Sequence, residues 1–319
     1  MKMKVAVIGG SGFIGTRLIE LLVSEHSVVN IDKKMSEEFP KITKICDVRD
    51  CERLTSYLVG VEVIINLAAE HADNVTPKSL YYDVNVVGAK NIVEAAVKNN
   101  IKRILFTSSV ALYGLDKDCS LETDEVEPFN EYGSSKLKAE QVFLEWSRAG
   151  GNTVEIVRPV VIFGESNRGN VYNLLKQIYV GPFFMIGNGM NRKSMGYVGN
   201  ISAYLKDAVT NIKDTVFIVN YSDKPDLTMD ELVGFVVELI PGRARVLKIP
   251  YSVGVVGGIL FDLFSFITKR KYSISLIRVK KFCSNTVVNA DKLKDTGFNK
   301  PFTLKEGLRR TIKHGFSIK

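Results

Sequence analysis

The feature that most constrains the fold is a glycine-rich stretch, GGSGFIG, that follows an apolar run close to the N-terminus. The run Lys4–Gly9 predicts a β-strand, and the stretch Gly12–Ser24 predicts an amphipathic helix. Without side chains at Gly9, Gly12 and Gly15, the backbone can turn tightly and approach a pyrophosphate, which the positive end of the helix attracts. The pattern therefore predicts the first strand, turn and helix of a dinucleotide-binding sheet.

Short β-branched runs alternate with amphipathic stretches over the first two thirds of the 319-residue chain. This order is typical of an α/β fold with a doubly wound parallel sheet. We expect residues 1–164 to form this core, completed by later segments, and residues 165–319 to form mainly a smaller substrate-binding lobe. A further strand is predicted at Val216–Val219, in this later and less regular part of the chain. The remaining predicted strands are Ser27–Ile31, Ile42–Cys46, Val63–Leu67, Arg103–Ser108 and Thr153–Arg158, and the remaining predicted helices are Asp50–Leu58, Ser79–Lys98 and Tyr132–Arg148.

An acidic residue, Asp32, stands at the end of the second predicted strand. A carboxylate at this place can accept hydrogen bonds from the ribose of an adenosine and repels a 2′-phosphate, so NAD is favoured over NADP. Lys33 and Lys34 argue mildly for the phosphate, but adjacent lysines in a loop are more often a solvated edge. We therefore predict NAD as the cofactor, with Asp32 as the deciding residue.

A Tyr-x-x-x-Lys motif places a phenol and an ammonium one helical turn apart, so that the cation can lower the pKa of the phenol and make it a base. The chain contains this motif three times, and only the copy at Tyr132 and Lys136 begins a helix between the fifth and sixth predicted strands. Hydroxyl residues end the fifth strand and place Ser109 at the carboxyl edge of the sheet, where ligands bind. We predict Ser109, Tyr132 and Lys136 as the catalytic residues. The other two copies begin at Tyr113 and Tyr172.

Several short motifs stand along nearly the whole chain: GGSGFIG, the acid at Asp32, CDV at 46–48, NLAA at 66–69, DVN ending at Asn85, TSSVALYG at 107–114, YGSSK at 132–136 and RP at Arg158-Pro159. Together they resemble the extended short-chain dehydrogenases/reductases, the NAD-dependent epimerase/dehydratase family with its Rossmann core. The resemblance implies NAD as cofactor, adenine contacts at Asp47 and Val48, and a sugar diphosphate in the C-terminal lobe. The residues predicted to contact NAD are Gly9, Gly12, Phe13, Ile14, Gly15, Asp32, Asp47, Val48, Leu67, Ala68, Ala69, Asn85, Thr107, Tyr132, Lys136 and Pro159.

Three departures from the family pattern narrow the chemistry. The 4,6-dehydratases carry an Asp-Glu pair directly after the catalytic hydroxyl, where this chain has Val110 and Ala111, so dehydration is not expected. Many UDP-sugar epimerases place an Asn where Val161 stands, which argues against ordinary uridine-nucleotide recognition. The phosphate-binding Arg of the family aligns with Lys193, beside Arg192, so a diphosphate clamp is expected in altered form. The predicted substrate contacts are Ser109, His71, Asn170, Arg192 and Lys193.

A closer resemblance is carried by the stretches LAAEHADNVTPKSLYYDVNV, RGNVYNLLKQI, NRKSMGYVGN, YSDKPDL and IRVKKFC. They are similar to a subfamily of bacterial 4-epimerases that interconvert N-acetylglucosamine and N-acetylgalactosamine on diphospho-undecaprenol, for lipopolysaccharide O-antigen or another surface polysaccharide. Two alternatives stay open: a soluble UDP-N-acetylglucosamine 4-epimerase and a nucleotide-sugar 4-ketoreductase. A non-catalytic NAD-binding regulator is disfavoured because Ser109, Tyr132 and Lys136 are all present.

The segment 249–281 combines an apolar run with basic residues. Residues Ile249–Thr268 are almost wholly apolar apart from Asp262, and the basic tripeptide Lys269–Lys271 follows directly. The run barely reaches spanning length and carries a charge, so a transmembrane helix is not expected. An interfacial helix on an anionic membrane surface is favoured over a buried helix of the lobe. Nucleic-acid binding is disfavoured because few aromatic residues stand between the cations.

Composition adds expectations about compartment and partners. The net charge is +8, and the four cysteines and three histidines show neither zinc-ligand spacing nor the density of a disulfide scaffold. We therefore expect no metal and a reducing cytoplasm, and the start of the chain lacks the layout of a signal peptide. These features favour a cytoplasmic protein that is peripheral on the inner face of the cell membrane and binds a lipid-linked sugar diphosphate, with homodimer formation left open.

Overall fold

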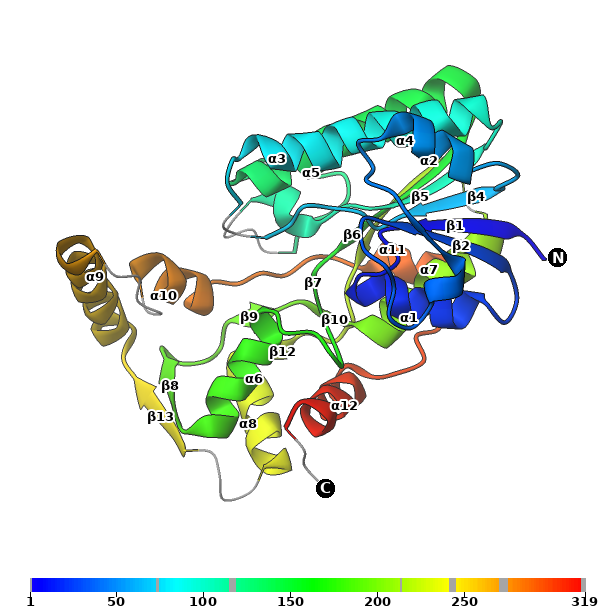
Figure 1. Ribbon diagram of the computed structural model, residues 1–319. Coiled ribbons are helices and arrows are strands. Elements are labelled where there is room, and N and C mark those ends of the chain that lie inside the picture. The colour runs from blue at the N-terminus through cyan, green and yellow to red at the C-terminus, as the bar shows by residue number, and fades with distance from the viewer. Residues whose placement is uncertain are drawn as a thin grey trace.

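The computed structural model describes residues 2–72, 75–114, 119–212, 214–240, 245–269 and 275–316. Its larger part is centred on a sheet (Figure 1) whose strands are β1 (Lys4–Ile8), β2 (Ser27–Asp32), β3 (Thr43–Ile45), β4 (Val63–Asn66), β5 (Arg103–Thr107), β6 (Thr153–Pro159) and β11 (Val216–Tyr221). The strand order is β11-β6-β5-β4-β1-β2-β3, and every neighbouring pair is parallel. The chain changes direction across the sheet beside β1, and such a switch point is where open α/β sheets bind ligands.

Helices cover both faces of this sheet (Figure 1). On one face, Leu54 of α2, Ile92 of α4 and Phe143 of α5 share a core with the strands. On the other face, Leu18 of α1 and Leu205 of α7 belong to a second core. Because both faces are buried, the strands read as nearly continuous apolar runs. The helices are α1 (Phe13–Leu22), α2 (Cys51–Tyr57), α4 (Gly88–Lys98), α5 (Glu131–Gly150), α7 (Val198–Thr210) and the short α11 (Asp291–Asp295).

The predicted doubly wound α/β fold is confirmed. Each of the six predicted strands of the N-terminal half differs from β1 to β6 by no more than one residue at either end. A seventh strand, β11, extends the predicted strand Val216–Val219 by two residues and pairs with β6. The sheet is therefore completed by a segment that follows much of the C-terminal lobe in the sequence.

The single helix predicted at Ser79–Lys98 is interrupted in the structure. It consists of α3 (Ser79–Tyr82), a π-helical segment at Asp83–Val87, and α4. Side-chain periodicity over one turn is too short a signal to separate a π turn from an α turn, so the sequence pattern does not show it. Such π segments often occur at functional sites, and this one carries the buried Asn85.

A smaller lobe with its own core lies below the sheet in Figure 1. Leu175, Phe183, Leu232 and Leu308 belong to one buried cluster. Three two-stranded pairs shape this lobe, β7 with β10, β9 with β12, and β8 with β13. Its elements are β7 (Val161–Phe163), α6 (Asn170–Val180), β8 (Pro182–Ile186), β9 (Arg192–Lys193), β10 (Met195–Tyr197), β12 (Leu227–Thr228), α8 (Met229–Leu239), β13 (Arg245–Ile249) and α12 (Leu304–Phe316).

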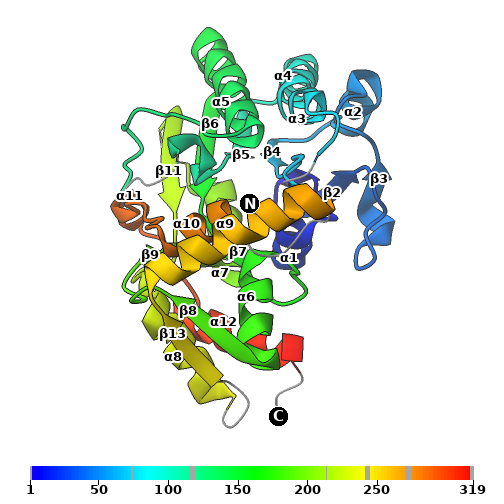
Figure 2. The ribbon, with the colours of Figure 1, turned by 90° about the vertical axis from the view of Figure 1, so that its left-hand side faces the viewer.

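Helix α9 (Tyr251–Thr268) projects from this lobe with α10 (Leu276–Cys283) beside it (Figures 1 and 2). Only Gly254 and Gly258 of its 18 residues are buried. Gly258 allows the close approach of α10, because a Cβ there would lie 2.8 Å from the Leu276 Cα. The Asp262 carboxylate accepts a hydrogen bond of 3.0 Å from the Leu276 N–H, at the start of α10.

The exposure of α9 excludes one of the two interpretations of this apolar run. The alternative of a buried lobe helix does not describe it, because its apolar side chains lie at the surface. Among the described residues it is the one helix that is long and apolar enough to cross a membrane by length and composition, with a mean hydropathy of 1.6. Lys269 follows the helix, and Arg270 and Lys271 lie outside the described residues.

Candidate active site

Glycines leave the backbone of the turn after β1 uncovered by side chains. Gly9 has a φ of 82°, and a Cβ there would lie 2.6 Å from the Ala68 backbone nitrogen. Gly12 is the N-cap of α1, and a Cβ on Gly15 would collide with the backbone of the turn. The first N–H groups of a helix have no partner within it, so this turn offers donors and a positive dipole end to an anion. Phe13, Ile14 and Gly15 are the first three residues of α1.

Asp32 ends β2 beside this turn. Its carboxylate accepts hydrogen bonds from the N–H groups of Ser11 (3.0 Å) and Lys34 (2.9 Å), which fix its position. The exposed Lys33 ammonium lies 4.0 Å from the Glu70 carboxylate. The acid predicted to select NAD is thus held by two backbone bonds, whereas the neighbouring Lys33 faces another acid.

Two further loops border the same edge of the sheet. After β3, the Asp47 carboxylate binds the Arg49 guanidinium through bonds of 3.0 and 2.8 Å, and this pairing lowers the pKa of Asp47. Val48 is buried, and its carbonyl accepts a bond of 2.9 Å from the Asn91 amide. Leu67–Ala69 follow β4 and lie against the glycine turn. Four of the predicted cofactor segments therefore meet at one edge.

Asn85 ties the loop after β4 to α5. Its Oδ1 accepts from the Glu70 N–H (2.8 Å), and its Nδ2 donates to the Glu70 carbonyl (3.1 Å) and to the Ser135 hydroxyl (2.8 Å). Ser135 lies on α5 between Tyr132 and Lys136. The buried amide therefore fixes the loop and the helix relative to each other, which is a positioning role.

Lys136 is fully buried one helical turn after Tyr132. Its ammonium donates a hydrogen bond of 2.6 Å to the carbonyl of Thr107 at the end of β5, and lies 4.4 Å from the centre of the Phe106 ring. Burial lowers the pKa of Lys136 to about 7, and the Glu140 carboxylate opposes this shift. The structure thus fixes the ammonium against the end of the strand that carries Ser109.

Tyr132 and Ser109 lie together at the end of β5. Burial raises the pKa of the Tyr132 phenol, and a hydrogen bond with the Ser109 hydroxyl opposes that shift. Ser109 also caps the following 3₁₀ turn, since its Oγ accepts from the Ala111 N–H at 3.1 Å. Asn130 caps α5 through a bond of 2.8 Å from the Gly133 N–H, which sets where Tyr132 begins. The three predicted catalytic residues are therefore brought together.

Residues that sequence reasoning missed lie behind this trio. The buried Arg158 guanidinium binds both oxygens of the Glu140 carboxylate, at 3.0 and 2.8 Å, and donates to the Tyr113 hydroxyl at 2.8 Å. Glu140 stands one turn after Lys136 on α5, and this spacing together with the RP motif was the available signal. The pair fixes α5 against β6, whose last residue is Pro159.

The tyrosines that begin the other two Tyr-x-x-x-Lys copies make hydrogen-bond and packing contacts within the fold. Tyr113 belongs to the Arg158 cluster and donates to Asn220 at 2.8 Å, while Lys117 lies outside the described residues. The Tyr172 ring stacks on Phe316, with centroids 5.3 Å apart. Within the described residues, the copy at Tyr172 and Lys176 forms no second constellation like that of Tyr132.

The predicted substrate contacts are more scattered. His71 and Asn170 are exposed, the first after β4 and the second at the start of α6. The Arg192 guanidinium donates to the Asp226 carbonyl at 3.0 Å. The Lys193 ammonium donates to the carbonyls that end α10 and to a threonine hydroxyl, at distances of 2.8, 2.5 and 3.2 Å. Both cations of the expected diphosphate clamp thus hold the lobe to neighbouring segments in this structure.

The sheet edge fits a dinucleotide on its own geometry. The glycine turn leaves a cradle that side chains would fill, and Asp32 stands at its rim. Ser108, directly before Ser109, has a buried hydroxyl without a hydrogen-bond partner among the described residues. Buried polar groups are nearly always bonded, so this hydroxyl is suited to a bound ligand.

Known proteins with similar sequences belong to the family that the motifs resemble. Residues 5–217 match the model of the NAD dependent epimerase/dehydratase family. The chain is 48% identical over 318 residues to the N-acetyl-alpha-D-glucosaminyl-diphospho-ditrans,octacis-undecaprenol 4-epimerase of Escherichia coli O157:H7, covering 99% of this chain and 96% of that relative.

Solved structures agree on the fold. The UDP-N-acetylglucosamine 4-epimerase from Bacillus cereus superposes with a TM-score of 0.78 at 17% identity, covering 100% of both chains. The UDP-glucose 4-epimerase from Thermus thermophilus, solved as a complex with NAD, superposes with a TM-score of 0.75 at 21% identity, covering 98% of this chain and 99% of that chain.

Proposed function

The chain belongs to the NAD-dependent epimerase/dehydratase family, and from that membership we propose that it is a 4-epimerase that interconverts N-acetylglucosamine and N-acetylgalactosamine on diphospho-undecaprenol. One observation carries the proposal: 48% identity to a relative named for that lipid-linked substrate, over nearly the full length of both chains. The similarity includes the C-terminal lobe and α9, where a substrate carrier would bind. The product would serve O-antigen or another surface polysaccharide.

The chemistry rests on the trio at the end of β5. Bound NAD supplies a reversible acceptor for the hydride at C4 of the sugar. Tyr132 takes the proton of the C4 hydroxyl, and Ser109 donates a hydrogen bond to the same oxygen. Because burial raises the pKa of the phenol, the Lys136 ammonium one turn away is needed to stabilise the phenolate. Tyr132 would return the proton to the same oxygen after the keto sugar has presented its other face, which would give the epimer.

The geometry also bears on the reactions that this site does not favour. Val110 and Ala111 begin the 3₁₀ turn directly after Ser109, so neither acid nor base stands there to remove water from the sugar. Tyr132, Ser109 and Lys136 alone would suit a ketoreductase equally well. The distinction is whether the hydride returns to the same sugar, which turnover experiments measure.

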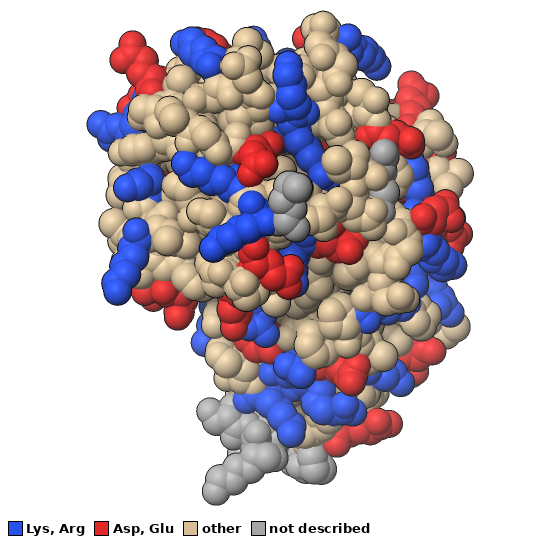
Figure 3. Space-filling view, turned by 90° about the vertical axis from the view of Figure 1, so that its right-hand side faces the viewer, with Lys and Arg blue, Asp and Glu red and all other residues tan. Residues whose placement is uncertain are grey.

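The membrane part of the proposal rests on α9. Phe266 is 84% exposed, Ile267 65% and Val256 56%, so the helix carries apolar side chains around most of its surface. Arg278 and Lys280 on the adjacent α10 are exposed cations. On the face of the molecule away from α9, acidic and basic side chains are interspersed (Figure 3). An apolar helix with basic neighbours fits the interface of an anionic membrane. This supports the proposal that the enzyme works on the inner face of the cytoplasmic membrane, where a lipid-linked substrate would reside.

The test offers the purified protein lipid-linked and UDP-linked N-acetylglucosamine side by side and follows both the product sugar and the oxidation state of NAD. The proposal expects epimerisation of the lipid-linked sugar without net oxidation or reduction of NAD. Turnover of the UDP-sugar with none of the lipid-linked one would overturn the substrate. Net consumption of reduced cofactor would instead identify a ketoreductase.

A further inference from the structure

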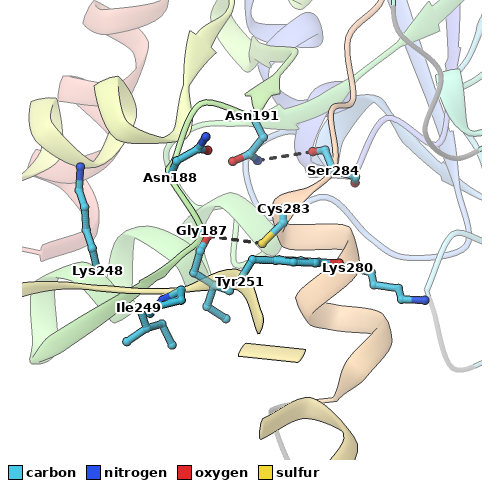
Figure 4. Close-up of a pocket in the computed structure, with 11 residues that line it drawn as sticks. Gly187, Asn188, Asn191, Lys248, Ile249, Tyr251, Lys280, Cys283 and Ser284 are labelled. Carbon is cyan, nitrogen blue, oxygen red and sulfur yellow. Dashed lines mark hydrogen bonds between the residues drawn. The ribbon is translucent and has the colours of Figure 1, made fainter. Parts of the chain in front are cut away.

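A cavity of about 880 Å³ lies where α9 and α10 leave the lobe (Figure 4). Its walls are the turn after β8, the end of β13, the first residue of α9 and the last turns of α10. A volume of this size is typical of a site for an organic ligand rather than for a single ion. The cavity shares no lining residue with the trio at the end of β5.

Several polar side chains of the cavity wall already have partners. Asn191 donates its amide hydrogens to two carbonyls at the end of α10, at 2.8 and 3.4 Å. The Asn188 carbonyl oxygen accepts from a backbone N–H of its own turn at 3.0 Å. The Lys248 ammonium lies 2.7 Å from the Asp230 carboxylate. These bonds occupy the amide hydrogens of Asn191, the side-chain oxygen of Asn188 and the ammonium of Lys248.

Two other polar side chains of the cavity wall differ in their bonding. In the part of the chain that the structure describes, the side chains of Lys280 and Tyr251 form neither a hydrogen bond nor an ion pair. Tyr251 reaches from the start of α9 toward Lys280 on α10 (Figure 4). An ammonium and a phenol hydroxyl are both donors, and such donors suit phosphate oxygens.

The rest of the wall is apolar and continues into α9. Ile186, Ile249 and Pro250 line the cavity, and Pro250 is the N-cap of α9. The exposed apolar side chains of α9 follow directly, beginning with Val253 at 55% exposure. A ligand in this cavity can therefore keep its anionic part at Lys280 and its hydrocarbon part along the surface that we assign to the membrane.

From this arrangement we propose that the cavity binds the carrier of the substrate, with the diphosphate at Lys280 and Tyr251 and the first isoprene units against Ile186, Ile249 and Pro250. The inference rests on the proposed function, because it assumes a lipid carrier. It adds the place where that carrier is recognised and the residues that distinguish it from a nucleotide.

Binding is measured by calorimetry on the full-length, NAD-loaded protein with farnesyl diphosphate, a soluble isoprenoid diphosphate that carries no sugar. Lys280→Ala is expected to weaken binding at least about tenfold, the size of a charge-assisted hydrogen bond. Tyr251→Phe should weaken it by a smaller factor and keeps the ring. The matched control is Lys102→Ala, which removes an exposed lysine directly before β5. UDP and farnesol serve as comparison ligands and should bind more weakly than farnesyl diphosphate.

Cys283 provides a readout of where the ligand sits, because this half-buried thiol lines the cavity. Alkylation by a maleimide is followed by mass spectrometry of the peptide that contains it. Farnesyl diphosphate is expected to suppress alkylation of Cys283 and to leave the exposed Cys119 unaffected. Undiminished alkylation of Cys283 under saturating ligand would place the ligand elsewhere and overturn the assignment.

Turnover separates this inference from the proposed function. With lipid-linked N-acetylglucosamine, Lys280→Ala should raise KM about tenfold and leave kcat within about twofold of wild type, because Lys280 binds the carrier and not the reacting sugar. A wild-type protein without activity on this substrate contradicts the proposed function. A wild type that is active while Lys280→Ala and Tyr251→Phe keep its KM contradicts the cavity assignment alone.

Discussion

The strands of the central sheet and helix α9 are both built from apolar residues, yet they lie in opposite surroundings. Ile8 of β1 and Phe106 of β5 are almost completely buried, whereas Phe266 of α9 is 84% exposed. In the sheet, helices from the same chain cover both faces. For α9 the described chain offers cover only where α10 and the end of β8 pass Gly254 and Gly258. An apolar run therefore predicts that a surface will be covered, but not what covers it.

The polar side chains of these two regions also differ in burial. Around the trio, Asn85, Lys136 and Arg158 are buried, and each is bonded to a backbone or side-chain partner. Near α9, the cations of α10 such as Lys280 are exposed. The bonded polar groups around the trio therefore fix the positions of the reacting side chains. The exposed cations beside α9 are instead available to a binding partner.

The largest effect is expected at the chemistry itself. Tyr132→Phe keeps the ring but removes the proton acceptor, so turnover should fall by about 100-fold or more, the usual contribution of a general base. Retention of NAD by the variant, measured on the purified protein, shows that the fold is intact. A variant that keeps more than about a tenth of wild-type kcat would contradict the role of Tyr132.

A nearly equal effect is expected on stability from the buried pair behind the trio. Arg158→Met leaves the Glu140 carboxylate buried without its partner, which typically costs about 3–5 kcal/mol. The matched control is Lys98→Met, which breaks an exposed pair with Glu94 (2.7 Å) and should cost far less, because water screens such a pair. Urea unfolding of both variants measures the difference, and equal losses would show that burial of the pair does not matter.

A smaller effect is expected at the surface of α9. Phe264→Asp combined with Ile267→Asp should weaken binding to anionic vesicles about tenfold or more, because burial of each side chain contributes about 1.5–3 kcal/mol. Val97→Asp is the control, since this side chain on α4 is also 60% exposed. Membrane flotation measures both variants. If the two float alike, α9 is no more a membrane surface than the rest of the molecule.

The affinities for NAD and NADP should differ by a factor of about ten. A carboxylate at the end of the second strand is expected to repel a 2′-phosphate, so NAD should bind at least about tenfold, ~1.4 kcal/mol, more tightly than NADP. Asp32→Asn should reduce this preference. Titration of both cofactors tests it, and equal affinities in the wild type would mean that Lys33 and Lys34 outweigh the carboxylate.

A further effect is a pH dependence of stability. The pKa of Lys136 is lowered to about 7 in the folded chain, below the value of about 10.4 in an unfolded chain. Between these pH values the unfolded chain binds more protons, so this group makes the folded state more stable as the pH rises. NAD-free wild type should therefore gain stability relative to Lys136→Met between about pH 7 and pH 9 in urea unfolding. Parallel pH profiles would contradict the burial of a titrating ammonium.

Much of the fold and of the trio could be predicted because local patterns carry them. The glycine turn, the acid at Asp32 and the Tyr-x-x-x-Lys spacing each depend on neighbours within a few residues. The Arg158 and Glu140 pair could not be predicted in the same way, because its partners are 18 residues apart and meet only when α5 packs on β6. The π turn that carries Asn85 was missed because a helical pattern does not reveal one wider turn.

The C-terminal lobe was less predictable for another reason. Lys193 aligns with a phosphate-binding position, but in the structure its ammonium binds carbonyls at the end of α10. Alignment supplies the position of a cation and not its partner, which depends on segments about 90 residues away. The cavity beside α10 likewise arises from β8, β13 and two helices, and no single motif marks it.

The central claim is that α9 brings the enzyme to a membrane-bound substrate and takes no part in the chemistry. The most direct test compares wild type with the Phe264→Asp, Ile267→Asp variant on N-acetylglucosamine linked to diphospho-undecaprenol in vesicles and on the same sugar linked to soluble farnesyl diphosphate. We predict that kcat/KM of the variant falls about tenfold or more on vesicles and stays at the wild-type value on the soluble substrate. Equal losses on both substrates, or no loss on vesicles, would contradict the account.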